Sequence, residues 1–179
     1  KKLVEKMGSL GLMGMIIPSK YGGSGLDMIS FVTAIIELAK ADASVAITMA
    51  AHTSLGSLPL LLYGSEEQKK RYLPRLAKGE IIGAFCLSEP EAGSDATSQQ
   101  TTAIEEDNYY LLNGTKNWIT NGNSASIYLV IAQTDPSLGH KGINAFIVEK
   151  ETDGVIVGKK EDKLGIRGSD THSIMFNDV

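Results

Sequence analysis

Residues 86–98, CLSEPEAGSDATS, hold the densest set of side chains that could do chemistry in this 179-residue sequence. Pro90 prevents a regular strand from continuing, and Gly93 allows the backbone to approach a ligand closely. Ser88, Ser94 and Thr97 add hydroxyl groups beside backbone N–H groups that a loop leaves free. Such donors can hold a phosphate without any basic residue. The same pattern suits a turn between two strands, so an anion-binding loop and a structural turn both stay open.

Elsewhere the sequence offers few groups for catalysis or metal binding. Its three histidines, His52, His140 and His172, lie far apart and are interpreted as structural or solvated rather than as metal ligands. The single cysteine, Cys86, excludes an intramolecular disulfide, and no Cys pair has metal-binding spacing. Trp118, the only tryptophan, lies in NWITNG, where a strand tryptophan is more typical of a core than of a cofactor site. The sequence contains no Walker A, GxGxxG, HExxH or GxSxG motif.

The composition indicates a globular protein with two unlike halves. Hydrophobic residues make up 42% and charged residues 21%, which excludes a disordered tail or a collagen-like repeat. The net charge of −4 argues against a general polyanion binder. Residues 1–80 carry 10 Lys/Arg and 7 Asp/Glu, whereas residues 81–179 carry 7 and 14. We therefore expect two different architectures with a boundary near residue 80.

The first half, residues 1–80, is predicted to be helical. Asp27 can cap a helix whose apolar residues recur at helical spacing. Residues 44–63 are apolar nearly all round, which we interpret as a helix buried between others rather than a membrane span. Residues 65–68, SEEQ, form a capping box that opens a further helix, and Gly79 ends it. The basic residues of that helix suit a solvated face.

The second half, residues 81–179, is predicted to consist of seven or eight short strands, among them IIGAFCLS, SIYLVIAQT and INAFIVEK. Asn113-Gly114 is the strongest short hairpin signal, so a turn is expected there. The predicted fold class is α+β, with a helical N-terminal segment (residues 1–80, part of an all-α domain) followed by an antiparallel β-barrel-like domain (residues 81–179). The sequence has no initiator Met, and we expect it to be a piece of a longer protein.

Residues 86–98 resemble the signature of the acyl-CoA dehydrogenase family. That signature reads small, aliphatic, Ser/Thr, Glu, two free positions, small, Gly, Ser/Thr, Asp, two free positions and small, and Cys86 through Ser98 fill every fixed position. Three further segments fit the family in order: IIPSKYGGSGLD, LNGTKNWITNG and KKEDKLGIRGSDT. GLMGMIIP and GKKEDKLGIRGS are most similar to short-chain, butyryl-type members. Phe85 and Glu91 depart from the family pattern, which often has Tyr and Gly at those positions.

The resemblance implies FAD as the cofactor and α,β-dehydrogenation of acyl-CoA thioesters as the reaction. A proton leaves Cα, and the β-hydrogen leaves as hydride to flavin N5. By resemblance, Phe85, Leu87 and Ser88 border the flavin pyrimidine, Trp118 lies against the isoalloxazine, and Thr120 places its hydroxyl near N5. Ser94 is implied to bind the FAD diphosphate and the CoA arm. The full implied cofactor-binding set is Phe85, Cys86, Leu87, Ser88, Gly93, Ser94, Trp118, Ile119 and Thr120.

The family subunit also has a C-terminal helical bundle, which this sequence lacks. The glutamate base lies in that bundle, so the resemblance implies that Glu89 is not the base and that this chain alone is inactive. The expected partners are an acyl-CoA substrate, electron-transfer flavoprotein as acceptor and further copies in a homotetramer, with no nucleic acid and no membrane span. The expected location is the bacterial cytoplasm or the mitochondrial matrix. The alternative is a flavin-binding paralogue with repurposed or no dehydrogenase activity, monooxygenase-like or a binding module.

Overall fold

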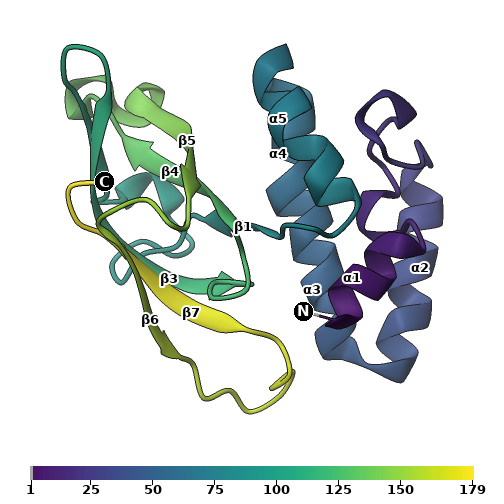
Figure 1. Ribbon diagram of the computed structural model, residues 1–179. Coiled ribbons are helices and arrows are strands. Elements are labelled where there is room, and N and C mark those ends of the chain that lie inside the picture. Colours follow the sequence, from purple (N-terminus) through teal and green to yellow (C-terminus); the bar gives the residue numbers. More distant parts are fainter. Residues whose placement is uncertain (1) are drawn as a thin grey trace. The chain divides into compact units, whose positions relative to one another are not determined.

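The computed structural model describes residues 2–179 and contains two compact units. The helical unit comprises residues 2–84 together with Asp162–Ser169, and the β unit comprises Phe85–Glu161 together with Asp170–Val179. Figure 1 labels the α-helices and most of the strands. The chain therefore leaves the β unit once, in the segment Asp162–Ser169, before its final strand. Nothing in the composition of that segment predicts this excursion.

Two helices of the helical unit begin at side-chain caps that the sequence predicts. Its helices are α1 (Lys2–Ser9), α2 (Met28–Ala41), α3 (Ala43–Ala51), α4 (Leu58–Tyr63) and α5 (Glu66–Ala77), with short 3-10 turns η1 (Leu12–Gly14) and η2 (Ser19–Tyr21). Asp27 accepts a hydrogen bond from the Ser30 N–H at the start of α2. Ser65 and Gln68 form the expected capping box of α5, and Gly79 follows that helix with φ 66°. These three sequence signals are confirmed.

The segment Ala43–Tyr63 is one long helix, because the π-helical turn η3 (His52–Ser57) joins α3 to α4. Among residues 2–179 it is the one helix whose length and composition would allow a membrane span, and 44% of its most apolar stretch is buried. His52 is fully buried, and its Nδ1 accepts from the Gly83 N–H at 3.2 Å. Leu55 and Tyr63 are exposed. The prediction of burial on all sides is therefore wrong, and the helix buries one face only.

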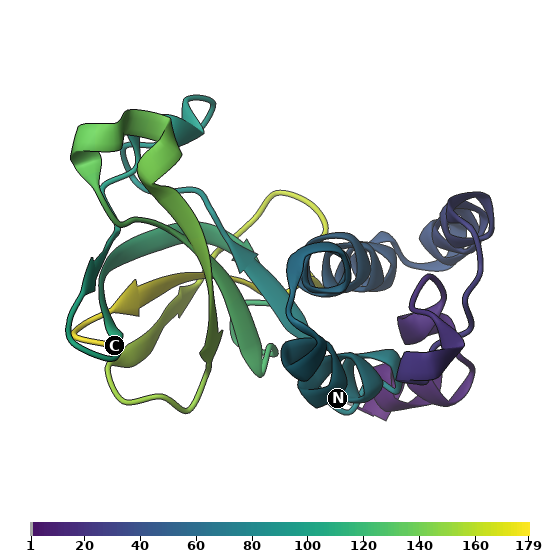
Figure 2. The same ribbon diagram turned by 90° about the horizontal axis from the view of Figure 1, so that it is seen from above.

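The β unit is a single curled sheet. Its strands are β1 (Gly83–Cys86), β2 (Thr102–Glu105), β3 (Tyr110–Thr120), β4 (Ile127–Gln133), β5 (Ile143–Glu149), β6 (Val155–Lys160) and β7 (Thr171–Phe176). The strand order is β1-β4-β2-β3-β7-β6, and β5 pairs with β4. Strand β3 pairs antiparallel with β2 and with β7, β4 pairs antiparallel with β5, and β6 pairs antiparallel with β7, whereas β2 and β4 share a short parallel contact. Figure 2 shows the sheet curling round on itself. The predicted α+β class with a barrel-like β domain is confirmed.

The hairpin predicted at Asn113-Gly114 is wrong. Strand β3 runs straight through both residues, and the chain reverses earlier, where the Glu106 N–H donates to the Tyr109 carbonyl at 2.9 Å. Gly114 has φ 150°, and a Cβ there would lie 2.4 Å from the Thr101 Oγ1. Glycine is required because two backbones approach closely, rather than because the chain turns.

Candidate functional site

The signature loop, residues 87–98, follows directly from strand β1. Cys86 at the end of that strand is fully buried, so only its backbone can face a ligand. Phe85, Leu87 and Ser88 are half-buried. The loop then makes a tight turn in which the Glu89 N–H donates to the Ala92 carbonyl at 2.9 Å. Pro90 lies inside this turn, as a residue without an N–H can.

The outer part of the signature loop is exposed and leaves donors free. Among the described residues, the backbone N–H groups of Gly93 and Ser94 have no hydrogen-bond acceptor, and a Cβ added to Gly93 would meet no atom within 4 Å. Thr97 differs from expectation, because its hydroxyl donates to the Asp95 carboxylate at 2.6 Å. The Ser98 hydroxyl donates to the same carboxylate at 2.5 Å, and these hydrogen bonds lower the pKa of Asp95. An anion could therefore use Gly93 and Ser94, whereas the Thr97 hydroxyl is already engaged.

Strand β3 carries a β-bulge at Asn117 and Trp118. Lys116 lies opposite Ile174 and Ile119 lies opposite His172, so two residues of β3 face one residue of β7. Trp118 has φ 63°, a left-handed conformation that is rare for a bulky residue. Its side chain is 60% exposed. The bulge thus turns this tryptophan out of the sheet, where its ring can stack on a planar ligand, and the expectation that a strand tryptophan packs in the core is wrong here.

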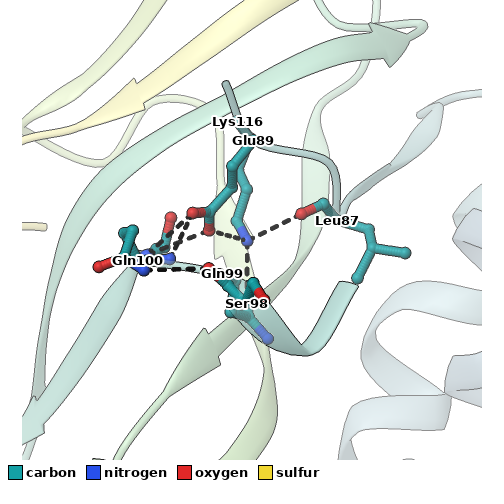
Figure 3. Close-up of polar contacts among 7 residues, drawn as sticks. Leu87, Glu89, Ser98, Gln99, Gln100 and Lys116 are labelled. Carbon is teal, nitrogen blue, oxygen red and sulfur yellow. Dashed lines mark hydrogen bonds and ion pairs between the residues drawn. The ribbon is translucent and has the colours of Figure 1, made fainter. Parts of the chain in front are cut away.

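A buried ion pair joins the signature loop to β3. The Lys116 ammonium lies 2.7 Å from the Glu89 carboxylate, and their side chains are 0% and 2% exposed. The same ammonium donates to the Leu87 carbonyl at 3.1 Å and to Gln99 Oε1 at 3.0 Å (Figure 3). Next to it, the Asn117 N–H donates to the Ser88 carbonyl at 2.7 Å. Residues 87, 88 and 89 are therefore all fastened to the two β3 residues that precede Trp118.

Both charges of this pair are stabilised by their surroundings. Burial alone would raise the pKa of Glu89, but hydrogen bonds from Lys116, Thr101 and the Gln100 N–H outweigh it and leave that pKa below its usual value. Burial lowers the pKa of Lys116, and the facing carboxylate opposes that fall. The thiol of Cys86 stays neutral, because burial raises its pKa. Glu89 is thus a fixed anion rather than a free proton acceptor.

The structure brings together some of the residues expected in the site and leaves others apart. Ser88 and Trp118 are linked through Asn117, and Thr120 lies two residues further along β3 and is half-buried. Ile119 is buried, so like Cys86 it can offer only backbone atoms. Among the described residues no hydrogen bond ties Gly93 or Ser94 to β3. Sequence reasoning missed Lys116 and Gln99, since charged and amide side chains are ordinarily expected in solvent.

Comparison with known proteins covers the whole chain. Residues 1–80 match the family "Acyl-CoA dehydrogenase, N-terminal domain", and residues 84–179 match "Acyl-CoA dehydrogenase, middle domain". An acyl-CoA dehydrogenase of Bacillus subtilis is 51% identical over 178 residues, which are 99% of this chain and 47% of the relative. The chain thus spans about half the length of the curated relatives it matches.

Solved structures agree with these matches. Butyryl-CoA dehydrogenase of Megasphaera elsdenii has a TM-score of 0.97 and 49% identity, covering 100% of this chain and 48% of that one. A chain from the structure described as the electron transferring flavoprotein of Acidaminococcus fermentans has a TM-score of 0.97 and 48% identity, covering 99% and 47%. An acyl-CoA dehydrogenase of Bacillus anthracis complexed with FAD has a TM-score of 0.91 and 42% identity, covering 99% and 30%. The matches to both of these family domains, over residues 1–80 and 84–179, show that the chain belongs to the acyl-CoA dehydrogenase family.

Proposed function

We propose that this chain is the flavin-binding part of an FAD-dependent enzyme that oxidises short-chain acyl-CoA thioesters between Cα and Cβ. The observation that carries the proposal is that hydrogen bonds hold the signature loop beside the exposed Trp118. The chain is also similar over its whole length to acyl-CoA and butyryl-CoA dehydrogenases. FAD, when bound, accepts the β-hydrogen as hydride at N5.

The residues of the β unit fit an isoalloxazine ring. Trp118 offers an exposed aromatic face. Thr120 lies two residues further along β3, and Ser88 is held next to Trp118 by the hydrogen bond from the Asn117 N–H to its carbonyl; both are half-buried hydroxyl residues. Hydroxyl and backbone N–H groups can donate to ring nitrogens and oxygens and so stabilise negative charge that arrives on the ring. Phe85 and Leu87 supply apolar contact and backbone groups. In this proposal the protein orients the ring and tunes its electronics.

The signature loop fits a diphosphate or the neighbouring CoA arm. The N–H groups of Gly93 and Ser94 and the Ser94 hydroxyl lie in an exposed loop with no acceptor among residues 2–179. Glu91 is exposed as well, so its carboxylate can stay in solvent and away from a bound anion. Ser94 is the residue proposed to contact both the FAD diphosphate and the substrate.

The proton acceptor is proposed to lie outside these 179 residues. Glu89 is the carboxylate within the signature, but it accepts hydrogen bonds from Lys116 and from two backbone N–H groups and is almost fully buried. A buried carboxylate whose negative charge is stabilised by these three donors is a poor proton acceptor. We therefore expect the isolated chain to be inactive. Acyl-CoA oxidation by the purified 179-residue chain would show that the base lies within it.

Electron-transfer flavoprotein is the proposed electron acceptor, and a homotetramer is the proposed assembly of the complete protein. The resemblance to the family supports both, and the similar chain in the Acidaminococcus fermentans structure supports the first. Neither requires a further cofactor in this chain.

An acyl-CoA panel tests the proposed reaction. The full-length protein is purified and its visible spectrum recorded, and then each thioester is offered with an artificial electron acceptor. We expect a yellow protein whose flavin is bleached most rapidly by butyryl-CoA. A flavin that no acyl-CoA reduces would instead support a repurposed flavin-binding paralogue, and a protein that binds no flavin would contradict the cofactor assignment itself.

A further inference from the structure

The buried Glu89–Lys116 pair connects the signature loop to strand β3, and each proton of the ammonium has an acceptor. A lysine ammonium has three protons to donate, and here its acceptors are the Leu87 carbonyl, Glu89 Oε1 and Gln99 Oε1. Glu89 accepts in addition from the Thr101 N–H at 3.1 Å and from the Gln100 N–H at 2.5 Å. One buried network thus joins residues 87–89, residues 99–101 and strand β3.

Stability alone gives a weak reason for such a pair. Removing two charges from water is costly, and a buried ion pair is often no more stable than apolar side chains of similar volume. The network even leaves the Nε2 of Gln99 and the Oγ1 of Thr101 buried with no partner among the described residues. Gln99 must turn its oxygen toward Lys116, because an ammonium can only donate. We therefore infer that the network fixes the positions of the segments it joins, at some cost in the free energy of folding.

The geometry that the pair fixes is the spacing between the signature loop and the bulge of β3. The Lys116 ammonium donates to the Leu87 carbonyl and to the Glu89 carboxylate, on either side of Ser88. The neighbouring Asn117 N–H donates to the Ser88 carbonyl itself. Trp118 follows at once, in its left-handed conformation. A displacement of Lys116 would therefore move Ser88 and Trp118 relative to each other.

We propose that Glu89 and Lys116 are positioning residues that set the relation of Ser88 to Trp118 and, through it, the binding and electronic properties of the flavin. This inference rests on the proposed function, since it concerns the same site. Neither residue touches the ring in this role. They act by holding the two segments that do.

The test is a double variant, Glu89→Gln/Lys116→Met, made in the full-length protein. It removes both charges together, so no buried carboxylate is left without a partner, and the fold is expected to survive. The Leu87 carbonyl and Gln99 lose their donor. We expect the FAD dissociation constant to rise about tenfold or more, which is 1.4 kcal/mol, together with a shifted reduction potential and altered visible absorption bands of the flavin that remains bound.

A matched control separates positioning from general destabilisation. Asn113→Ala breaks two hydrogen bonds between the same strand, β3, and Asp178, both 2.9 Å long, without touching the loop. It is expected to lower the melting temperature while leaving flavin affinity, potential and spectrum unchanged. Wild-type flavin properties in a folded double variant would overturn the positioning role, even if the wild-type enzyme oxidises acyl-CoA. Failure of the wild-type protein to bind flavin would instead contradict the proposed function.

Discussion

The signature loop can be tested for anion binding with two substitutions that the fold should tolerate. Ser94 is exposed, and a Cβ at Gly93 would meet no protein atom within 4 Å. Ser94→Ala removes one neutral donor, and Gly93→Val sets a branched side chain over the free N–H groups. The melting temperature of the full-length apoprotein, measured after the flavin is removed, should stay unchanged for both, so any loss of binding reports on the ligand rather than on folding.

The size of the effect follows from the charge of the acceptor. A hydrogen bond to a charged group contributes about 1.5–3 kcal/mol, so Ser94→Ala should weaken FAD or acyl-CoA binding roughly ten- to a hundredfold. Gly93→Val should weaken it further, because it blocks the approach to two N–H groups. Flavin retention during dialysis and titration with butyryl-CoA measure these affinities.

Glu91→Gln is the matched control, since Glu91 is exposed in the same loop. It removes a negative charge and leaves every donor in place, so it should not weaken anion binding. If Ser94→Ala and Gly93→Val both bind FAD and butyryl-CoA as the wild type does, the loop is only a turn between two strands.

Three further predictions concern the flavin ring, the buried pair and His52. Thr120→Val should change the flavin potential or its rate of reduction by butyryl-CoA, and wild-type values for both in stopped-flow and potentiometric measurements would exclude that role. Lys116→Met leaves the buried Glu89 carboxylate without its counter-charge and should lower the free energy of unfolding in urea by about 3–5 kcal/mol. Lys40→Met, which breaks an exposed ion pair, should cost less than about 1 kcal/mol; equal costs would contradict the burial argument. Burial lowers the pKa of His52 to about 4, whereas the unfolded chain takes up this proton near pH 6.5. The free energy of unfolding should therefore fall by roughly 3 kcal/mol as pH drops from 6.5 to 4, and His52→Asn should remove that part of the slope, which urea titrations at several pH values measure.

The elements that were predictable from the sequence are those governed by local chemistry. Asp27 caps a helix because its carboxylate reaches an N–H three residues ahead, and the capping box at Ser65 is equally local. Gly79 ends α5 because it adopts a positive φ without strain. Alternating apolar residues gave the strands of the β unit for the same reason, since the side-chain period of a strand is a local property.

The errors arise where a distant segment decides the local conformation. Asn113-Gly114 has the composition of a hairpin turn, yet Gly114 lies beside the backbone of Thr101 and Asn113 bonds to Asp178 near the end of the chain. Both partners are invisible to a local pattern. The long helix shows the same limit, because it is apolar nearly all round and its sequence cannot reveal which face packs against a neighbour.

The candidate site shows the same difference between local and distant interactions. The signature loop could be recognised from the sequence, whereas the buried pair that holds it against β3 could not. Ser88, Gly93 and Ser94 lie within one short segment, so their types and spacing could be compared directly with a signature. Lys116 is 27 residues from Glu89, and two charged residues at that separation give no sign that both are buried. Trp118 points outward only because a bulge interrupts the strand. The contact groups can therefore be found by comparison, whereas the pair that holds them in place follows only from the packing of β3 against the loop.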